Sequence, residues 1–157
     1  MQLLSHAEVL DSFERRYRKL VALPRDFNEV DWNVLDFLGW IDVGTARGFI
    51  VAEHRGDVRG LVFQRGPSSD RTKRRAHMCS LCKTIHGDQG VRTFTVRHHR
   101  NANRTLSNEY CDDLRCSLRV RGLISLPPNQ MPETLSAEEK ALRLQLEVEQ
   151  LFDRCLK

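Results

Sequence analysis

Near each end of the chain, large apolar residues recur three or four positions apart. At the N-terminal end, Ser5 and Glu8 have the spacing of a capping box, and the apolar residues Val9, Phe13, Tyr17 and Leu20 follow. This pattern predicts a helix from about residue 6 to about residue 22. Pro24 is expected to end it, because a proline inside a helix lacks the N–H donor and clashes with the preceding turn.

The C-terminal end shows the same pattern. Ser136 and Glu139 again have capping-box spacing, and one face of the predicted helix, from about residue 137 to about residue 156, carries Leu144, Val148, Leu151 and Cys155. Cys155 lies on this apolar face, so it is predicted to be a core residue and not a metal ligand.

Between the two helices the pattern is typical of strands and turns. Trp32 and Trp40 are predicted to anchor a short helix or turn in the core. Residues 49–52 and 58–63 are rich in strand-forming residues, and residues 54–57 separate them. This arrangement predicts a β-hairpin.

A second hairpin is predicted further along. Apolar and polar residues alternate over residues 91–97, residues 98–104 form a basic turn, and a return strand leads to Cys111. Asp112 is then predicted to cap a helix that ends at Gly122.

Four of the five cysteines form two close pairs. Two residues separate Cys79 from Cys82, four separate Cys111 from Cys116, and 28 residues lie between the pairs. A spacing of two residues brings both sulfurs to one side of a tight turn, and Zn²⁺ takes four thiolates in a tetrahedron. The spacing therefore predicts one structural zinc ion held by these four residues.

Disulfide bonds and buried unbonded thiols are the alternatives to metal binding. Disulfides need an oxidising compartment, yet the first ten residues show no basic region followed by an apolar one, and no run approaches the roughly 20 apolar residues of a membrane span. We therefore expect a cytoplasmic protein without a membrane partner. Four histidines are candidate replacement ligands that we expect to be ordinary polar residues: His77, His86, His98 and His99.

We call the tight turn that carries Cys79 and Cys82 the knuckle. A knuckle followed by a hairpin and a helix is the order of elements in a treble-clef zinc finger, which here spans residues 77–122. The predicted fold class is α+β: a small antiparallel β structure with a treble-clef zinc finger, flanked by an N-terminal helix and a long C-terminal helix. We expect residues 1–30 to form the N-terminal helix and a connector, and residues 31–157 to form the α+β domain.

Charge is unevenly distributed along the chain, whose formal net charge is +4. Residues 59–121 carry 14 Lys or Arg against 5 Asp or Glu, a net +9, whereas residues 1–58 carry 7 against 10 and residues 122–157 carry 4 against 6. This basic block predicts an acidic protein surface or RNA as the partner. Its candidate partner-binding residues are Arg71, Lys73, Arg74, Arg75, Lys83, Arg97, Arg100 and Arg104.

RNA binding and catalysis are weighed against protein binding. Phe94 and Tyr110, on adjacent predicted strands, are candidates either to stack on bases or to fill the core. An enzyme with a small-molecule substrate is not expected, because four thiolates leave zinc no open position for water. The sequence also shows no Ser-His-Asp pattern, phosphate loop or dinucleotide fingerprint.

With these elements placed, the chain resembles the C-terminal treble-clef zinc-finger domain of FusB-type proteins, which are fusidic-acid-resistance factors that bind elongation factor G. It is most similar to their short actinobacterial "FBP" members. The segments that carry the resemblance are 35–40, 51–54, 78–82 and 110–122. The resemblance implies a zinc-containing protein that docks on elongation factor G and promotes its release from the ribosome, without chemistry of its own.

The sequence departs from the resistance factors in two respects. Those proteins use three cysteines and one histidine, and the place of the histidine, two residues after the third thiol, holds Asp113 here. The resemblance then implies that Cys82 supplies the fourth ligand. The resistance factors also carry an N-terminal helical bundle where one helix is predicted here, which suggests that the factor-binding surface is kept and part of the resistance activity is lost.

Overall fold

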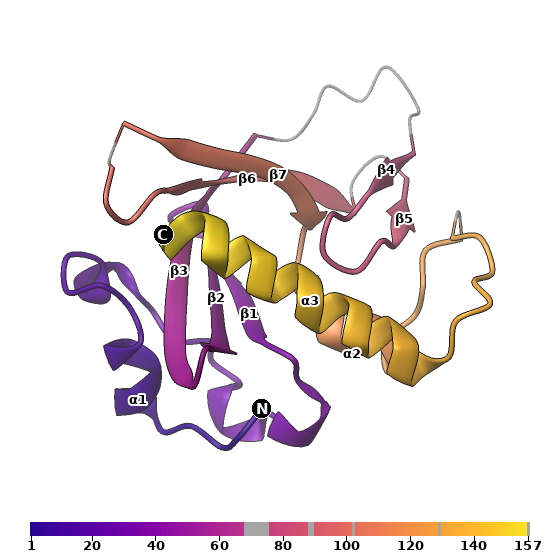
Figure 1. Ribbon diagram of the computed structural model, residues 1–157, viewed down its shortest axis with the longest axis horizontal. Coiled ribbons are helices and arrows are strands. Elements are labelled where there is room, and N and C mark those ends of the chain that lie inside the picture. Colours follow the sequence, from indigo (N-terminus) through magenta and orange to yellow (C-terminus); the bar gives the residue numbers. More distant parts are fainter. Residues whose placement is uncertain (68–75, 88–89, 102, 129, 157) are drawn as a thin grey trace.

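The structure is a computed structural model of the 157-residue chain, and it describes residues 1–67, 76–87, 90–101, 103–128 and 130–156. Its main element is a five-stranded antiparallel sheet in the order β1-β2-β3-β6-β7 (Figure 1). The strands are β1 (Leu38–Asp42), β2 (Arg47–His54), β3 (Asp57–Arg65), β6 (Val91–Arg97) and β7 (Thr105–Cys111). A separate two-stranded sheet consists of β4 (His77–Met78) and β5 (Ile85–His86). The helices are α1 (His6–Asp11), α2 (Cys116–Val120) and α3 (Ala137–Leu156), with 3-10 turns at Arg18–Leu20, Phe27–Glu29 and Trp32–Val34.

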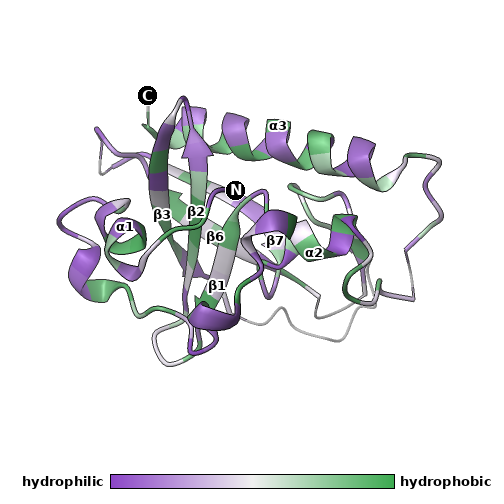
Figure 2. Cartoon of the chain, turned by 90° about the horizontal axis from the view of Figure 1, so that it is seen from below, coloured by the Kyte–Doolittle hydropathy of each residue, from purple (hydrophilic) through white to green (hydrophobic). Residues whose placement is uncertain are grey.

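The two faces of the sheet each have a hydrophobic core. Figure 2 shows α3 along one side of the sheet and, on the other, residues 1–37, which include α1 and which we call the N-terminal segment. Successive side chains of a strand point to opposite faces. In β2, Ile50 and Ala52 therefore join the core under α3, whereas Phe49 and Val51 join the core under the N-terminal segment. Because both faces are covered, β2 is buried without interruption from residue 48 to residue 52.

The predicted C-terminal helix is confirmed as α3. Ser136 and Glu139 form the expected capping contacts, with the Ser136 N–H donating to the Glu139 carboxylate (2.7 Å) and the Glu139 N–H donating to Ser136 Oγ (3.2 Å). The predicted apolar face is buried, and Cys155 in it is only 1% exposed. Cys155 is a core residue, as expected.

The N-terminal helix is much shorter than predicted. Its capping box is present, but α1 ends at Asp11 because the carbonyls that a longer helix needs are bonded elsewhere. Ser12 O accepts a hydrogen bond from the N–H of Gly60 in β3 (2.9 Å), and Phe13 O accepts one from Arg18 Nε (3.1 Å). Phe13 is nevertheless buried, and a Cβ on Gly60 would lie 2.6 Å from its ring, so glycine allows this packing.

Both predicted hairpins are confirmed. β2 and β3 are joined by Arg55 and Gly56, whose positive φ values of 55° and 86° are those of a two-residue turn that matches the twist of a hairpin. β6 and β7 pair from residues 91 and 111 to residues 97 and 105. Trp32 lies in a 3-10 turn as expected, whereas Trp40 lies in β1, where its indole N–H donates to Ala22 O (2.8 Å).

The α+β fold class is confirmed, with antiparallel sheets and a long helix at the C-terminus. Among the described residues, no helix is both long enough and apolar enough to span a membrane.

Candidate metal centre

The first pair of thiols lies in the turn between β4 and β5. Two backbone hydrogen bonds close this turn: the Cys79 N–H donates to Thr84 O (2.9 Å), and the Lys83 N–H donates to Cys79 O (2.9 Å). Lys83 has a positive φ of 61°, which lets the chain reverse directly after Cys82. Both sulfurs therefore lie inside the turn, as the spacing predicts.

The second pair spans the end of β7 and the start of α2. Cys111 is the last residue of β7, and Cys116 is the first residue of α2. Between them, the Leu114 N–H donates to Cys111 O (2.9 Å), and Leu114 has a positive φ of 55°. Gly39 in β1 makes room for this turn, since a Cβ there would lie 2.5 Å from Leu114 O.

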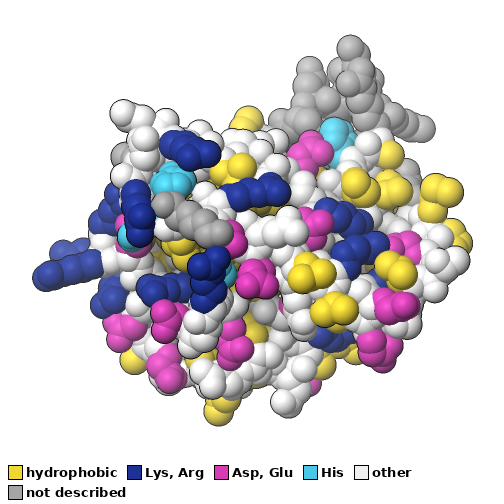
Figure 3. All heavy atoms as spheres, viewed as in Figure 1, with side chains coloured by type: hydrophobic (Ala, Val, Ile, Leu, Met, Phe, Trp, Pro, Cys, Tyr) yellow, Lys and Arg dark blue, Asp and Glu magenta, His cyan; other side chains and the backbone are white. Residues whose placement is uncertain are grey.

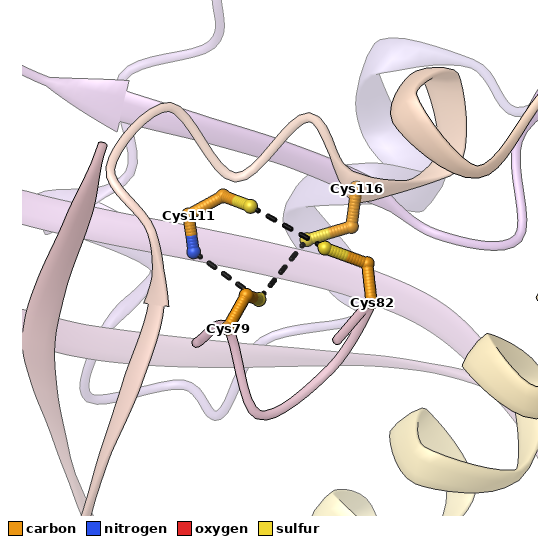
Figure 4. A group of neighbouring side chains, drawn as sticks. All are labelled: Cys79, Cys82, Cys111 and Cys116. Carbon is orange, nitrogen blue, oxygen red and sulfur yellow. Dashed lines mark hydrogen bonds between the residues drawn. The ribbon is translucent and has the colours of Figure 1, made fainter. Parts of the chain in front are cut away.

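The four sulfurs point toward one another (Figure 4). All lie within 4.8 Å of one another, with 3.7 Å between the sulfurs of Cys79 and Cys116 and 3.4 Å between those of Cys82 and Cys111. Tetrahedral zinc with bonds of about 2.3 Å to sulfur requires sulfur-to-sulfur distances of about 3.8 Å, whereas a disulfide requires about 2.05 Å. All five cysteines are unbonded. The cluster therefore has the size and the soft donor set of a zinc site, and it can hold one ion.

The environment of the thiols favours a bound cation. None of the four residues is more than 2% exposed. The neighbouring thiols, Cys111 first, raise the pKa of Cys116, and the hydrogen bond from Cys111 lowers the pKa of Cys82. Buried thiols this close cannot all ionise by themselves. A divalent ion compensates the negative charge, so its binding releases the protons.

Two nitrogen atoms lie next to the sulfurs. The Cys111 N–H donates to Cys79 Sγ (3.3 Å), and His86 Nε2 lies 3.3 Å from Cys111 Sγ. His86 is only 3% exposed, and burial lowers its pKa. A neutral ring that donates from Nε2 would hold the thiolate in place, as groups around metal ligands commonly do. Residue type alone does not separate His86 from the other histidines; its position on the strand that closes the knuckle is the signal.

The other three histidines lie away from the sulfurs. Their contacts are His77 with Glu109 (3.0 Å), His99 with Glu14 (2.7 Å), and His98 with the N–H of Arg100 (3.2 Å). Among the described residues, the group close enough to hold a metal consists of the four cysteines alone.

The helix after the second pair does not begin where predicted. Asp112 does not cap it, because α2 starts at Cys116 and Arg115 occupies the cap position without a side-chain hydrogen bond. The Asp112 carboxylate instead accepts two hydrogen bonds from the guanidinium of Arg65 (2.7 and 2.6 Å).

Asp113, at the place of the family's histidine, is also held outside the cluster. Its carboxylate accepts two hydrogen bonds from Arg119 (2.7 and 2.8 Å) and one from the Arg115 N–H (3.0 Å). The sulfur of Cys82 lies in the cluster, close enough to the other three to share a metal ion with them.

The structure describes four of the eight predicted partner-binding residues, and Lys83 lies apart from the other three. The other four lie outside the described residues: Arg71, Lys73, Arg74 and Arg75. Lys83 is half-buried in the knuckle, where its ammonium binds Glu147 (2.6 Å) and Ser80 O (2.7 Å). The remaining three, Arg97, Arg100 and Arg104, are exposed in and beside the β6–β7 loop.

The β6–β7 loop meets basic residues from distant parts of the chain. The His99 N–H donates to Cys155 O (2.9 Å), and Arg16 donates to His99 O (3.5 Å). These contacts bring the end of α3 and the segment after α1 to the loop, where Figure 3 shows Lys and Arg side chains gathered. We call this surface the basic end; its exposed members are Arg15, Arg16, Arg97, Arg100, Arg104 and Arg154.

Phe94 and Tyr110 are core residues. They are 0% and 2% exposed and stack on each other with ring centroids 5.9 Å apart. They are therefore not available to stack on the bases of RNA.

Comparisons with known proteins agree with this geometry. The sequence profile of the family described as "FBP C-terminal treble-clef zinc-finger" matches residues 8–155. Among solved structures, the chain is similar to the fusidic acid resistance protein FusC, with a TM-score of 0.55 and 20% sequence identity. The likeness covers 74% of this chain and 52% of the FusC chain, so the chain spans about half the length of FusC. No curated protein gave a significant match. Because the profile covers nearly all of the sequence and the four thiols form the expected zinc site, the chain belongs to the FBP C-terminal treble-clef zinc-finger family.

Proposed function

We propose that this protein docks on translation elongation factor G and modulates its release from the ribosome, without catalysis of its own. The observation that carries the proposal is the family match over residues 8–155. The FusB-type proteins that the chain resembles are fusidic-acid-resistance factors that bind elongation factor G. FusC, which shares the fold, is likewise a fusidic acid resistance protein.

In this proposal the zinc ion has a structural role. Four thiolates would complete its coordination and leave no position for water or substrate. The ion would join the β4–β5 knuckle to the end of β7 and the start of α2. The folded structure of these segments would then depend on the metal. With the metal bound, the surface around them would be rigid enough to recognise a protein.

The basic end supports an acidic partner. Its six members are exposed, and their positive charge complements elongation factors, which are generally acidic. Complementary charge raises the rate of association more than it raises the final affinity. RNA remains the second candidate, because phosphates would be attracted to the same side chains.

A double charge reversal tests the proposal. The variant Arg97→Glu/Arg100→Glu should slow association with purified elongation factor G by about tenfold at low salt and reduce its salt dependence. The matched control Arg25→Glu/Arg59→Glu makes the same change in net charge at two exposed arginines outside the basic end, and it should have a much smaller effect. Zinc content and thermal melting should not change in either variant.

The same variants separate the two candidates. If the surface serves RNA, the slope of log affinity for RNA against log salt should fall by about 0.7 to 0.9 for each phosphate that the variant no longer neutralises. A fall in RNA affinity with unaltered binding to elongation factor G would contradict the proposal, and so would a wild-type protein that does not bind elongation factor G at all.

A further inference from the structure

The edge strand β1 is bordered by a groove. Among the described strands, β1 pairs with β2 alone, and a groove of about 960 Å³ follows the other side of β1 from residue 37 to residue 44. One wall of the groove consists of residues between 22 and 35, and the other consists of residues between 113 and 123. Figure 1 shows β1 at the end of the sheet, between the N-terminal segment and α2. The groove therefore has the length of a short strand and lies parallel to an unpaired one.

The register of the sheet shows which backbone groups of β1 face the groove. In a two-residue hairpin the flanking pair is hydrogen-bonded, here His54 with Asp57, and bonded and non-bonded pairs then alternate. Gly60 confirms this alternation, because its N–H leaves β2 and donates to Ser12 O. The same alternation applies to the pairing of β1 with β2, in which Gly39 lies opposite Ile50 and Ile41 lies opposite Gly48. The N–H and C=O groups of Gly39 and Ile41 therefore point away from β2 and toward the groove.

In the described part of the chain, these outward groups have no backbone partner from another element. No hydrogen bond outside the sheet is formed by the backbone of Gly39 or Ile41 within the part of the chain that the structure describes. Unpaired strand edges are templates for a further strand. A strand added at this edge would lie in the groove, between its two walls.

The walls also specify the side chains of an occupant. Apolar residues predominate along the groove, and two of them are strongly exposed at its rim: Val43 (83%) and Leu123 (55%). The wall formed by residues between 22 and 35 carries Asp26, Glu29 and Asp31, all of which are exposed. None of these three carboxylates takes part in an ion pair with any of the described residues.

Two arginines, Arg25 and Arg115, also line the groove, against five acidic residues, so its charge is negative overall. We propose that the groove binds an extended segment of a partner protein as an added strand beside β1, with apolar side chains alternating with Lys or Arg. The backbone groups of Gly39 and Ile41 would supply affinity, and the two walls would select alternate side chains. This site is separate from the basic end and does not depend on the function proposed above.

A defined peptide provides the test. The probe is a fluorescein-labelled octapeptide of alternating Val and Arg with blocked ends, titrated into the zinc-loaded full chain and followed by fluorescence anisotropy. The same peptide N-methylated at alternate residues keeps the charge but cannot pair with a strand, and it should bind at least tenfold more weakly. Hydrogen exchange should show that the probe slows exchange at the amides of Gly39 and Ile41, whereas Trp40, already paired with β2, should change little.

Two variants test the site, one by removing a backbone N–H and one by reversing charge. Ile41→Pro removes an N–H only from the open edge, where proline is tolerated, and should weaken probe binding at least tenfold. Asp26→Lys/Glu29→Lys reverses two exposed charges that the core does not use, and it should weaken probe binding at least fivefold. This second variant tests the proposal even if Ile41→Pro lowers the melting temperature of the protein. Both variants should bind elongation factor G as the wild type does. Unchanged probe affinity in the charge variant, equal binding of the N-methylated peptide, or exchange that slows elsewhere would overturn the proposal.

Discussion

Arg65, at the end of β3, donates two hydrogen bonds to Asp112, the residue that follows the third thiol of the zinc site (2.7 and 2.6 Å). The two side chains are 22% and 25% exposed, and Arg92 approaches the same carboxylate at 3.3 Å. This pair connects the sheet to the turn that carries Cys111. It therefore links the stability of the sheet to the order of the metal centre.

Replacing either partner of this pair should lower the free energy of unfolding. Arg65→Gln should cost about 1.5 to 3 kcal/mol, the usual range for a hydrogen bond to a charged group. Asp112→Asn should cost more, because it leaves two arginines, Arg65 and Arg92, without their counter-charge. Urea unfolding of the zinc-loaded variants and of the double variant measures the coupling energy; costs that simply add would contradict the link.

Removal of zinc should unfold the middle of the chain. A closed four-thiolate site contributes on the order of 10 to 16 kcal/mol of apparent binding energy, most of it expressed as folding. Cys79→Ser and Cys111→Ser should purify with substoichiometric zinc, measured by mass spectrometry of the metal, and should be cut by protease between residues 79 and 116. Cys155→Ser is the matched control and should keep its zinc. Full occupancy in Cys111→Ser would show that the ligand assignment is wrong.

The features that the sequence predicted correctly depend on residues close together in the chain. The Ser136 capping box, the Arg55-Gly56 turn and the Cys79-to-Cys82 knuckle each form within a few residues. The four-thiol site is long-range, but the preference of zinc for four sulfurs relates the two pairs without knowledge of the path between them.

The features that the sequence did not reveal depend on partners far along the chain. Helix α1 stops early because Gly60 bonds Ser12 O, a contact that helical spacing cannot indicate. Within the described part of the basic block, Lys83 does not join the basic end, because its ammonium pairs with Glu147 on α3. The basic end, by contrast, includes Arg15 and Arg16, which sequence order places far from the hairpin loop.

The close approach of Leu114 to β1 predicts a severe effect of a single methyl group. In Gly39→Ala the new Cβ would lie 2.5 Å from Leu114 O, a backbone atom that cannot turn aside. The change should cost about 1 to 3 kcal/mol, as overpacking of a core does. It should also weaken zinc binding, since Leu114 lies between Cys111 and Cys116.

Gly44→Ala is the matched control for this variant. Its Cβ would meet nothing nearer than a side-chain oxygen of Asp42 at 3.4 Å, so unfolding and zinc competition should be close to those of the wild type. Equal behaviour of the two variants would contradict the tight contact between β1 and the metal-centre turn.

Cys155 should make the stability of the protein depend on pH in the alkaline range. Burial raises the pKa of the Cys155 thiol from its ordinary 9.0 to about 11. The folded protein therefore keeps the thiol proton at a pH where the unfolded chain has lost it. This contribution is complete below pH 9 and disappears as the pH rises to about 11, a decrease of about 2 to 3 kcal/mol.

The variant Cys155→Ala isolates this contribution from the packing of the side chain. The cavity left by the substitution costs the same at every pH, so the difference in free energy of unfolding between wild type and variant should be constant up to about pH 8.5 and should shrink above it. In the zinc-loaded protein the metal occupies the other four thiols, so labelling by iodoacetamide reports on Cys155. Because this thiol is buried and protonated, iodoacetamide at pH 8.5 should label it much more slowly than it labels a free cysteine. Rapid labelling of the native protein, or a stability difference that does not change between pH 8.5 and 11, would show that the thiol is not held protonated by the core.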